Sequence, residues 1–274
     1  MANIQGTFLA WQNWVDLADT TFHASQERTD NRVVANLSNA QSDDVWRVDI
    51  ASGATSATAT ITLSQPRSVQ LVTLQFPRFE YPGVSEVNPN FAKTDTIRIR
   101  LLDANENVVF DSTAQSANVE PGYMVYYVKL NAAVDTSKCE LTLDAPSRVT
   151  QGFLDVGNLG LWPIWEPQRG FAYPASYGWV LNTENAKTPA GRLFTNRFDP
   201  FREWSLTFDT LTNQEAGQVE ELIRYSGGAR QVFVRRGDLE PSKDAMLCVV
   251  TRLRPIDSRT ATLRQFSGTF EEFI

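Results

Sequence analysis

The chain has 274 residues, of which 42% are hydrophobic, and its formal net charge is −7. This length allows one large domain or two ordinary ones, each with a real hydrophobic core. The acidic balance argues against a nucleic-acid partner, because binding to a phosphate backbone needs concentrated Lys and Arg. The basic residues look scattered, and we interpret the tight pair Arg235–Arg236 as part of a solvated face.

The first residues, Met1–Gly6, lack the charged start and apolar run of a signal peptide. No apolar run reaches the roughly 18 residues that a membrane-spanning helix needs. The two cysteines, Cys139 and Cys248, lie far apart, and they cannot form a zinc site without further ligands. We therefore expect no membrane insertion, no cofactor or metal, and synthesis in a reducing cytoplasm.

Residues 1–24 form an N-terminal segment that is rich in large apolar side chains, among them Phe8, Trp11 and Trp14. Such a segment is too apolar for a free disordered tail. It either packs on its own chain, the usual fate of large apolar side chains, or acts as an arm that docks on a neighbouring subunit. The sequence is compatible with both packing on its own chain and docking on a neighbouring subunit.

Residues 25–162 have an all-β pattern. Residues 57–63 alternate between apolar side chains and threonines, residues 64–67 read as a turn, and residues 69–76 read as a central strand. Further strands are expected at 45–48, 97–101, 108–110, 123–130, 139–143 and 153–161. Short strands with polar turns between them predict a β-sandwich.

A long polar loop at 77–94 interrupts this pattern and is the candidate binding loop. Its aromatic, carboxylate and amide side chains could stack on a sugar and form hydrogen bonds with it. The residues concerned are Phe79, Glu80, Tyr81, Asn88 and Asn90. The alternative is a long loop that only packs on itself or on a neighbour. No spacing of ligands in it is diagnostic of calcium.

The proline-containing stretch Trp162–Pro167 predicts a domain boundary, so residues 163–274 form a second domain. Residues 203–211 alternate as a strand, with Trp204 and Phe208 on its apolar face. A capping box of Thr212 and Glu215 then predicts the start of a helix over about 212–226.

Strands at about 230–236, 245–253 and 260–274 complete this domain, and residues 182–192 read as an exposed loop. The segment before that loop is unusually aromatic, and such surfaces often mark interfaces. The candidate assembly contacts are Trp11, Trp14, Phe171, Tyr173, Tyr177 and Trp179.

The sequence offers no catalytic constellation. It contains no nucleophile elbow, phosphate loop, dinucleotide fingerprint or zinc-protease motif. The single histidine, His23, lies in the apolar N-terminal segment, and no partners for a triad can be named. The carboxylate pairs Asp43–Asp44 and Glu271–Glu272 are sequence neighbours, and neighbours in a strand point to opposite faces.

Three stretches carry a resemblance to a known family. Residues 36–63, with Asn36-Leu37 and Asp44-Val-Trp-Arg47, resemble the opening of the galactose-binding-like (discoidin-type) β-sandwiches found in bacteriophage tail proteins. Residues 97–103 and 153–161 continue that pattern. The second half, from Arg202-Glu-Trp-Ser-Leu-Thr-Phe208 to Phe266-Ser-Gly-Thr-Phe270, is similar to phage distal-tail and tail-tube-like domains.

This resemblance implies a mainly β, two-domain fold. A galactose-binding-like jelly-roll sandwich would be followed by a distal-tail-like β domain with one flanking helix. It implies a virion structural protein of a tail tip or baseplate, which forms a homo-oligomeric ring and contacts other tail proteins such as tube and hub. The alternatives are a carbohydrate-binding module for host-surface glycans and, with less support, a polysaccharide-degrading enzyme.

Overall fold

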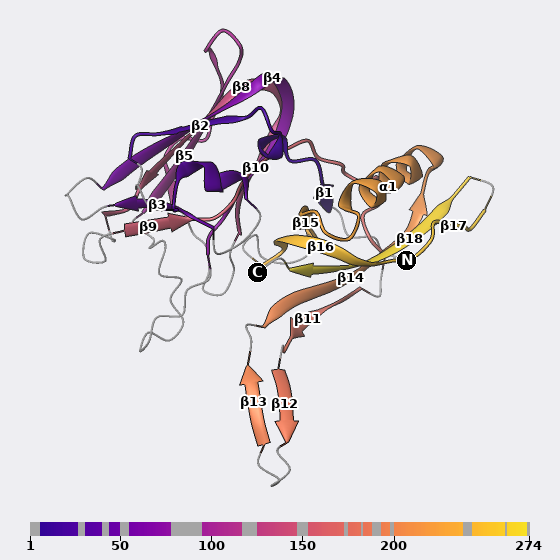
Figure 1. The fold of residues 1–274 in the computed structure, drawn as a ribbon. Coiled ribbons are helices and arrows are strands. Elements are labelled where there is room, and N and C mark those ends of the chain that lie inside the picture. Colours follow the sequence, from indigo (N-terminus) through magenta and orange to yellow (C-terminus); the bar gives the residue numbers. More distant parts are fainter. Residues whose placement is uncertain are drawn as a thin grey trace.

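The structure, a computed structural model, describes residues 6–26, 31–39, 44–49, 55–77, 95–116, 125–146, 153–172, 175–181, 183–187, 193–197, 200–237, 243–260 and 262–272. These residues form antiparallel sheets, the helix α1 (Asn213–Ser226) and two short 3-10 helices, η1 (Trp14–Asp16) and η2 (Val34–Ser38). The mainly β class predicted from the sequence is confirmed (Figure 1). Within the described ranges, no helix is long and apolar enough to cross a membrane.

The first large sheet has the strand order β10–β4–β8–β5–β6, with β2 beside β4 and β7 beside β5. Its strands are β2 (Thr21–Ala24), β4 (Ser56–Gln75), β5 (Thr96–Leu102), β6 (Val108–Asp111), β7 (Gln115–Ser116), β8 (Val125–Asp144) and β10 (Leu159–Trp162). A two-stranded layer of β3 (Trp46–Asp49) and β9 (Phe153–Val156) faces it. The core between the two layers includes Trp46, Ile61, Ile99 and Val156.

The strands β4 and β8 are each 20 residues long and pair with each other along most of their length. The prediction of a turn at 64–67 and of separate strands at 123–130 and 139–143 is therefore wrong. The ladder between them is interrupted by a register shift between Thr62 and Arg67. Pro66, which has no N–H to donate, lies in that unpaired stretch, where a strand tolerates proline.

The second large sheet has the strand order β1–β15–β16–β18–β14–β11, and β17 pairs with β18. Its strands are β1 (Phe8–Ala10), β11 (Ser176–Val180), β14 (Phe201–Leu211), β15 (Val232–Arg235), β16 (Ala245–Leu253), β17 (Asp257–Ser258) and β18 (Arg264–Glu272). Helix α1 covers one face of this sheet (Figure 1). As predicted, the apolar face of β14 shares a core with helix residues such as Val219 and Leu222.

The start of α1 also follows the sequence prediction. The amide N–H of Glu215 donates to Thr212 Oγ1 at 3.3 Å, and the N–H of Thr212 donates to Glu215 Oε2 at 2.8 Å. This reciprocal pair is the expected capping box. Gly227 ends the helix in the left-handed conformation, with φ of +49°.

A two-stranded hairpin of β12 (Thr183–Lys187) and β13 (Leu193–Arg197) extends away from the second sheet, beyond β11 and β14 (Figure 1). The expected exposed loop at 182–192 is therefore wrong for residues 183–187, which form a strand. Strand formation there depends on pairing with residues 193–197, which the polar composition of the stretch does not reveal.

The N-terminal segment contributes one strand to each large sheet. Strand β1 pairs with β15, and β2 pairs with β4. The backbone of Leu9 also exchanges hydrogen bonds of 2.9 and 2.8 Å with Trp165. In this structure the described part of the segment thus packs on its own chain. The proposed boundaries at residues 24 and 162 stay a prediction.

The two large sheets meet through a buried apolar cluster, which we call the junction. It comprises Phe8, Ala10, Leu71, Val125, Trp162, Phe233, Ala245 and Leu247. These residues belong to β10, β4 and β8 of the first sheet and to β1, β15 and β16 of the second. The junction thus involves three neighbouring strands of each sheet, counted from β10 in the first sheet and from β1 in the second.

Gly160 shows how tightly the first sheet is packed beside the junction. A Cβ atom at this position would lie 1.9 Å from the indole nitrogen of Trp162 and 2.4 Å from the Thr73 hydroxyl. That indole N–H donates a buried hydrogen bond of 2.8 Å to the same hydroxyl. Only glycine leaves room for this arrangement.

Candidate functional site

The candidate binding loop with Phe79, Glu80, Tyr81, Asn88 and Asn90 lies outside the described residues. Its role in glycan binding stays a prediction. The same holds for Tyr173 among the candidate assembly contacts.

The remaining assembly candidates fall into two groups. Trp11, Trp14 and Phe171 pack on their own chain: Phe171 is fully buried in the core beneath α1, and Trp11 lies edge-on to Trp165, with ring centroids 6.1 Å apart. The indole N–H of Trp14 donates to the carbonyl of Ser68 at 2.9 Å. Phe171 is therefore corrected from a surface contact to a core residue, because it packs against the second sheet.

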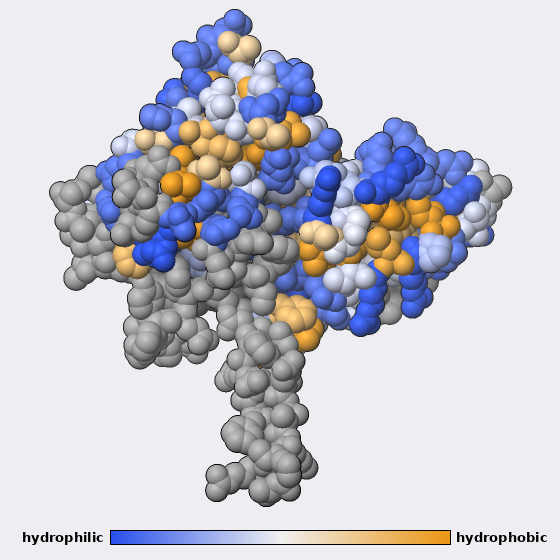
Figure 2. All heavy atoms as spheres, in the orientation of Figure 1, coloured by the Kyte–Doolittle hydropathy of each residue, from blue (hydrophilic) through white to orange (hydrophobic). Residues whose placement is uncertain are grey.

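The other group lies on β11, the outermost strand of the second sheet. Tyr177 is 59% exposed and Trp179 is 43% exposed, and Leu181, directly after the strand, is 73% exposed. Figure 2 colours residues by hydropathy, and its larger hydrophobic areas lie over the first sheet and beside α1, so the surface of β11 is defined by the exposure of these three side chains. Exposed aromatic side chains on an outermost strand are a feature that proteins usually avoid, because such an edge invites pairing with another chain.

A buried arginine lies next to this strand. Arg236 is only 1% exposed, and its guanidinium carbon is 4.3 Å from the ring centre of Tyr177 and 5.4 and 5.5 Å from those of Phe171 and Trp204. Such cation–π contacts are favourable. The interpretation of Arg235–Arg236 as a solvated face is thus wrong for Arg236, whose charge is covered by aromatic rings that come from distant parts of the chain.

An ion pair anchors the neighbouring strand β14 to β18. Arg202 donates to Glu272 from its side chain, and both side chains are almost fully buried. Trp179 is paired with Arg202, and Tyr177 with Trp204, so strand β11 lies directly beside β14 in the same sheet. The exposed side chains of β11 thus lie on a strand whose neighbour is joined to β18 by a buried ion pair.

The outermost strand of the first sheet, β6, carries the other exposed large apolar side chains of the described residues. These are Val108, 44% exposed, and Val109, 38% exposed. The sequence predicts a strand at 108–110, but no local pattern indicates that this strand is the edge of the sheet. That assignment depends on pairing with β5.

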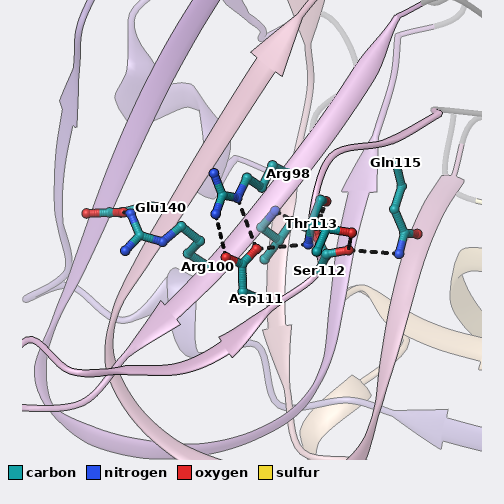
Figure 3. A network of polar contacts seen from close by, with 8 residues as sticks. Arg98, Arg100, Asp111, Ser112, Thr113, Gln115 and Glu140 are labelled. Carbon is teal, nitrogen blue, oxygen red and sulfur yellow. Dashed lines mark hydrogen bonds and ion pairs between the residues drawn. The ribbon is translucent and has the colours of Figure 1, made fainter.

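A polar network fixes β6 on β5 and is drawn in Figure 3. The guanidinium of Arg98 donates to both carboxylate oxygens of Asp111 at 3.0 and 2.5 Å, and Arg100 pairs with Glu140 at 2.9 Å. The hydrogen bonds from Arg98 lower the pKa of Asp111 to about 2. The N–H of Thr113, a residue with φ of +58°, also donates to Asp111 at 2.8 Å. The charged side chains of β5 and β6 thus pair with one another and with Glu140, and these pairs hold β6 against β5.

The described residues contain no group of three or more His, Cys, Asp or Glu that could hold a metal ion. His23 is exposed on β2. Glu272 is buried with Arg202, whereas Glu271 accepts a hydrogen bond from Thr251 at the surface. The side chains of Glu271 and Glu272 therefore point to opposite faces of β18, as expected for neighbours in a strand. Both cysteines are free and buried, and burial raises the pKa of Cys139 to about 12, which keeps the thiol protonated.

No protein-family model matches the sequence, and no curated protein matches it. Among solved structures, the chain is similar to a Clostridium perfringens module, CpGH89CBM32-5, in complex with GalNAc-β-1,3-galactose. The TM-score is 0.43 with 10% identity, over 56% of this chain and 100% of the module.

Two further likenesses are of the same kind. The family 32 carbohydrate-binding module of Clostridium perfringens NanJ, in complex with galactose, has a TM-score of 0.42 with 14% identity, over 57% of this chain and 99% of that one. The lectin domain of lectinolysin, complexed with Lewis b antigen, has a TM-score of 0.40 with 13% identity, over 55% of this chain and 96% of that domain.

Proposed function

We propose that this chain is a non-enzymatic virion structural protein of a bacteriophage tail tip or baseplate, which assembles with copies of itself into a ring on the tail tube. The phage setting comes from the resemblance of the sequence to distal-tail and tail-tube-like domains. The observation that carries self-assembly is the surface of β11, where Tyr177, Trp179 and Leu181 are exposed on the outermost strand of a sheet.

The hairpin β12–β13 gives this surface a second element that can reach a neighbour, because it extends beyond the sheet next to β11 (Figure 1). The proposed partners are further copies of the chain and other tail proteins such as tube and hub. The proposed location is the virion tail, after synthesis in the cytoplasm of the bacterial host.

Negative-stain electron microscopy of the purified full-length chain tests this proposal. We expect closed rings of uniform diameter, and a variant in which a short glycine–serine linker replaces residues 182–198 should give fewer of them. Isolated particles of the size of a single chain at every concentration would contradict the proposal.

Carbohydrate binding by the first sheet and its facing layer is the second candidate. It is motivated by the resemblance of residues 36–63, 97–103 and 153–161 to galactose-binding-like sandwiches, and by the two-layer β arrangement of this region. A glycan array probed with the full-length chain should then show binding that Phe79→Ala and Tyr81→Ala both weaken. An array without any bound glycan would remove this candidate and leave the assembly proposal intact.

A further inference from the structure

Three arginines follow strand β18 at the end of the second sheet that lies away from the junction. They are Arg252, Arg254 and Arg259, and their contacts on β18 are, in the same order, Thr269, Ser267 and Gln265. These contact residues are partly exposed and lie two apart along the strand, which is a spacing of about 7 Å on one face of the sheet. The three arginines therefore form a row along that face, which we call the arginine row.

The arginine row is exposed, and described carboxylates do not neutralise it. Among the residues that the structure describes, none of the three arginines forms an ion pair. Glu271, further along β18, accepts a hydrogen bond from Thr251. The stretch 252–264 contains four arginines, and Asp257 is its single acidic residue. The end of the sheet thus presents a concentrated positive charge in a chain whose net charge is −7.

The negative charge belongs to the other part of the chain. Residues 11–162, whose described strands form the first sheet and its facing layer, contain 18 Asp and Glu against 11 Lys and Arg. Residues 163–274 contain 14 of each kind. Residues 11–162, which we call the acidic part, therefore carry the whole formal charge of −7. Their exposed acidic side chains include Asp19, Asp49, Glu106 and Asp135.

Strand β16 shows how far the arginine row lies from the acidic part of its own chain. The strand enters the junction through Ala245 and Leu247 near its start, whereas Arg252 lies near its end. The seven residues from Ala245 to Arg252 span about 23 Å of extended chain. In Figure 1 the end of the second sheet that carries β17 points away from the first sheet. One molecule thus has a basic end and an acidic end.

We propose that the arginine row of one copy binds the acidic part of the next copy, so that complementary charge directs head-to-tail assembly. This inference rests on the proposed self-assembly and names the charged surfaces that direct it. Two arginine rows repel each other, as do two acidic parts, whereas the unlike surfaces attract. A contact between unlike surfaces can repeat from copy to copy, as a closed ring requires. Arginine suits such a contact because its guanidinium can donate two parallel hydrogen bonds to one carboxylate.

The net charge of the chain favours this partner over a polyanion such as a nucleic acid or a sulfated glycan. A chain with a charge of −7 repels a polyanion at long range. Binding to a phosphate backbone also needs more positive side chains than three. A second copy, in contrast, offers separate carboxylates on a folded surface.

Charge reversal in the full-length chain tests the arginine row. The row variant carries Arg252→Glu and Arg254→Glu. The matched control carries Arg169→Glu and Arg224→Glu, which changes the net charge equally at two exposed arginines outside the row. Circular dichroism melting first establishes that each variant is folded, and sedimentation velocity then gives the size of the species formed.

The wild type and the control should assemble in the same concentration range at about 0.1 M salt. The row variant should need at least about a tenfold higher concentration, because it places like charges against each other. Raising the salt to about 1 M should weaken assembly of the wild type, since the screening length falls from about 10 Å to about 3 Å. General destabilisation does not produce this salt dependence together with an unaffected control.

A zero-length cross-link identifies the surface that the row contacts. The conservative variant Arg252→Lys/Arg254→Lys keeps both positive charges and introduces amines, which a carbodiimide joins to carboxylates in direct contact. Mixing isotope-labelled and unlabelled chains separates links between copies from links within one copy. We expect mass spectrometry to find links between copies from the introduced amines to carboxylates of residues 11–162. Links between copies that reach only residues 163–274, or no such links, would overturn the inference.

Further outcomes separate the inference from the proposed function. If the row variant assembles like the wild type, the arginine row is not part of the contact, while self-assembly stands. If a short heparin fragment binds the wild type but not the row variant, and both assemble alike, the row serves a polyanion and the inference is wrong. If the wild type is monomeric at every concentration and salt, the proposed function fails, and the inference fails with it.

Discussion

The side-chain amide of Gln231, directly before β15, donates a buried hydrogen bond of 3.0 Å to Oε1 of Gln75, the last residue of β4. This bond links the two large sheets beside the apolar junction. Replacing either residue by Leu leaves a buried amide without this partner, and we expect a loss of about 1–3 kcal/mol in the free energy of unfolding.

The double variant Gln75→Leu/Gln231→Leu provides the control. Because it removes both polar groups, it should be more stable than the sum of the two single losses predicts. Urea unfolding of the four proteins gives the coupling energy, and strictly additive losses would show that the two amides do not interact.

The packing of Gly160 under the indole of Trp162 gives a second prediction. Gly160→Ala forces a buried ring to move, so we expect destabilisation of about 1–3 kcal/mol. Gly217→Ala is the matched control, because nothing lies within 4 Å of its Cβ position and Gly217 is inside α1. Alanine there should stabilise the protein by roughly 0.5–1 kcal/mol. Thermal unfolding of both variants tests this prediction. Equal melting temperatures of Gly160→Ala and Gly217→Ala would contradict the tight packing around Gly160.

The third prediction concerns the core beneath α1. Phe208 is buried on the helix-facing side of β14 and stacks on Phe266, with ring centroids 6.3 Å apart. Phe208→Ala should lower the free energy of unfolding by about 3–5 kcal/mol. Ser205→Ala, on the opposite face of the same strand, should change it by less than about 0.5 kcal/mol. A Phe208→Ala variant that unfolds at the wild-type urea concentration would refute this arrangement.

The fourth prediction is a pH dependence at the junction. Burial raises the pKa of Asp244 to about 6, although Arg235, 3.0 Å away, opposes this rise. Tyr127 lies on the other side of the carboxyl group, and burial raises the pKa of its hydroxyl to about 12, so it stays neutral. The native state therefore holds the proton of Asp244 more tightly than the unfolded state does.

The stabilisation from that proton is complete below the unfolded pKa near 4, and it is lost as the pH rises through about 6. Asp244→Asn cannot titrate at this position. From pH 4 to pH 7.5 the wild type should therefore lose up to about 3 kcal/mol relative to Asp244→Asn. Urea unfolding at both pH values tests this, and parallel pH profiles of the two proteins would contradict it.

The sequence predicted local features well where neighbouring residues determine them. The capping box of Thr212 and Glu215, the helix that follows and the alternation of β14 are examples, because each depends on side chains a few residues apart. The pairing of Phe8–Ala10 with β15 joins segments more than 220 residues apart. No local pattern indicates that pairing, and the continuity of β4 through Pro66 was hidden by residues that usually form a turn.

The candidate assembly contacts also depend on pairing between distant segments, which the sequence does not reveal. Composition pointed to an aromatic segment before the hairpin, but it could not separate Phe171, which is buried, from Tyr177 and Trp179, which are exposed. That difference arises when β11 pairs with β14 and Phe171 enters the core beneath α1. For Arg236, adjacent charge suggested solvent exposure, whereas rings from two other parts of the chain cover it.

If this chain assembles with copies of itself, its mass in solution must exceed that of one chain. Sedimentation equilibrium of the full-length chain over a wide concentration range gives this mass without labels or a partner. We predict a discrete species whose mass is a fixed multiple, greater than two, of the 30.7 kDa chain. The mass of a single chain at every concentration would show that the protein does not assemble with itself.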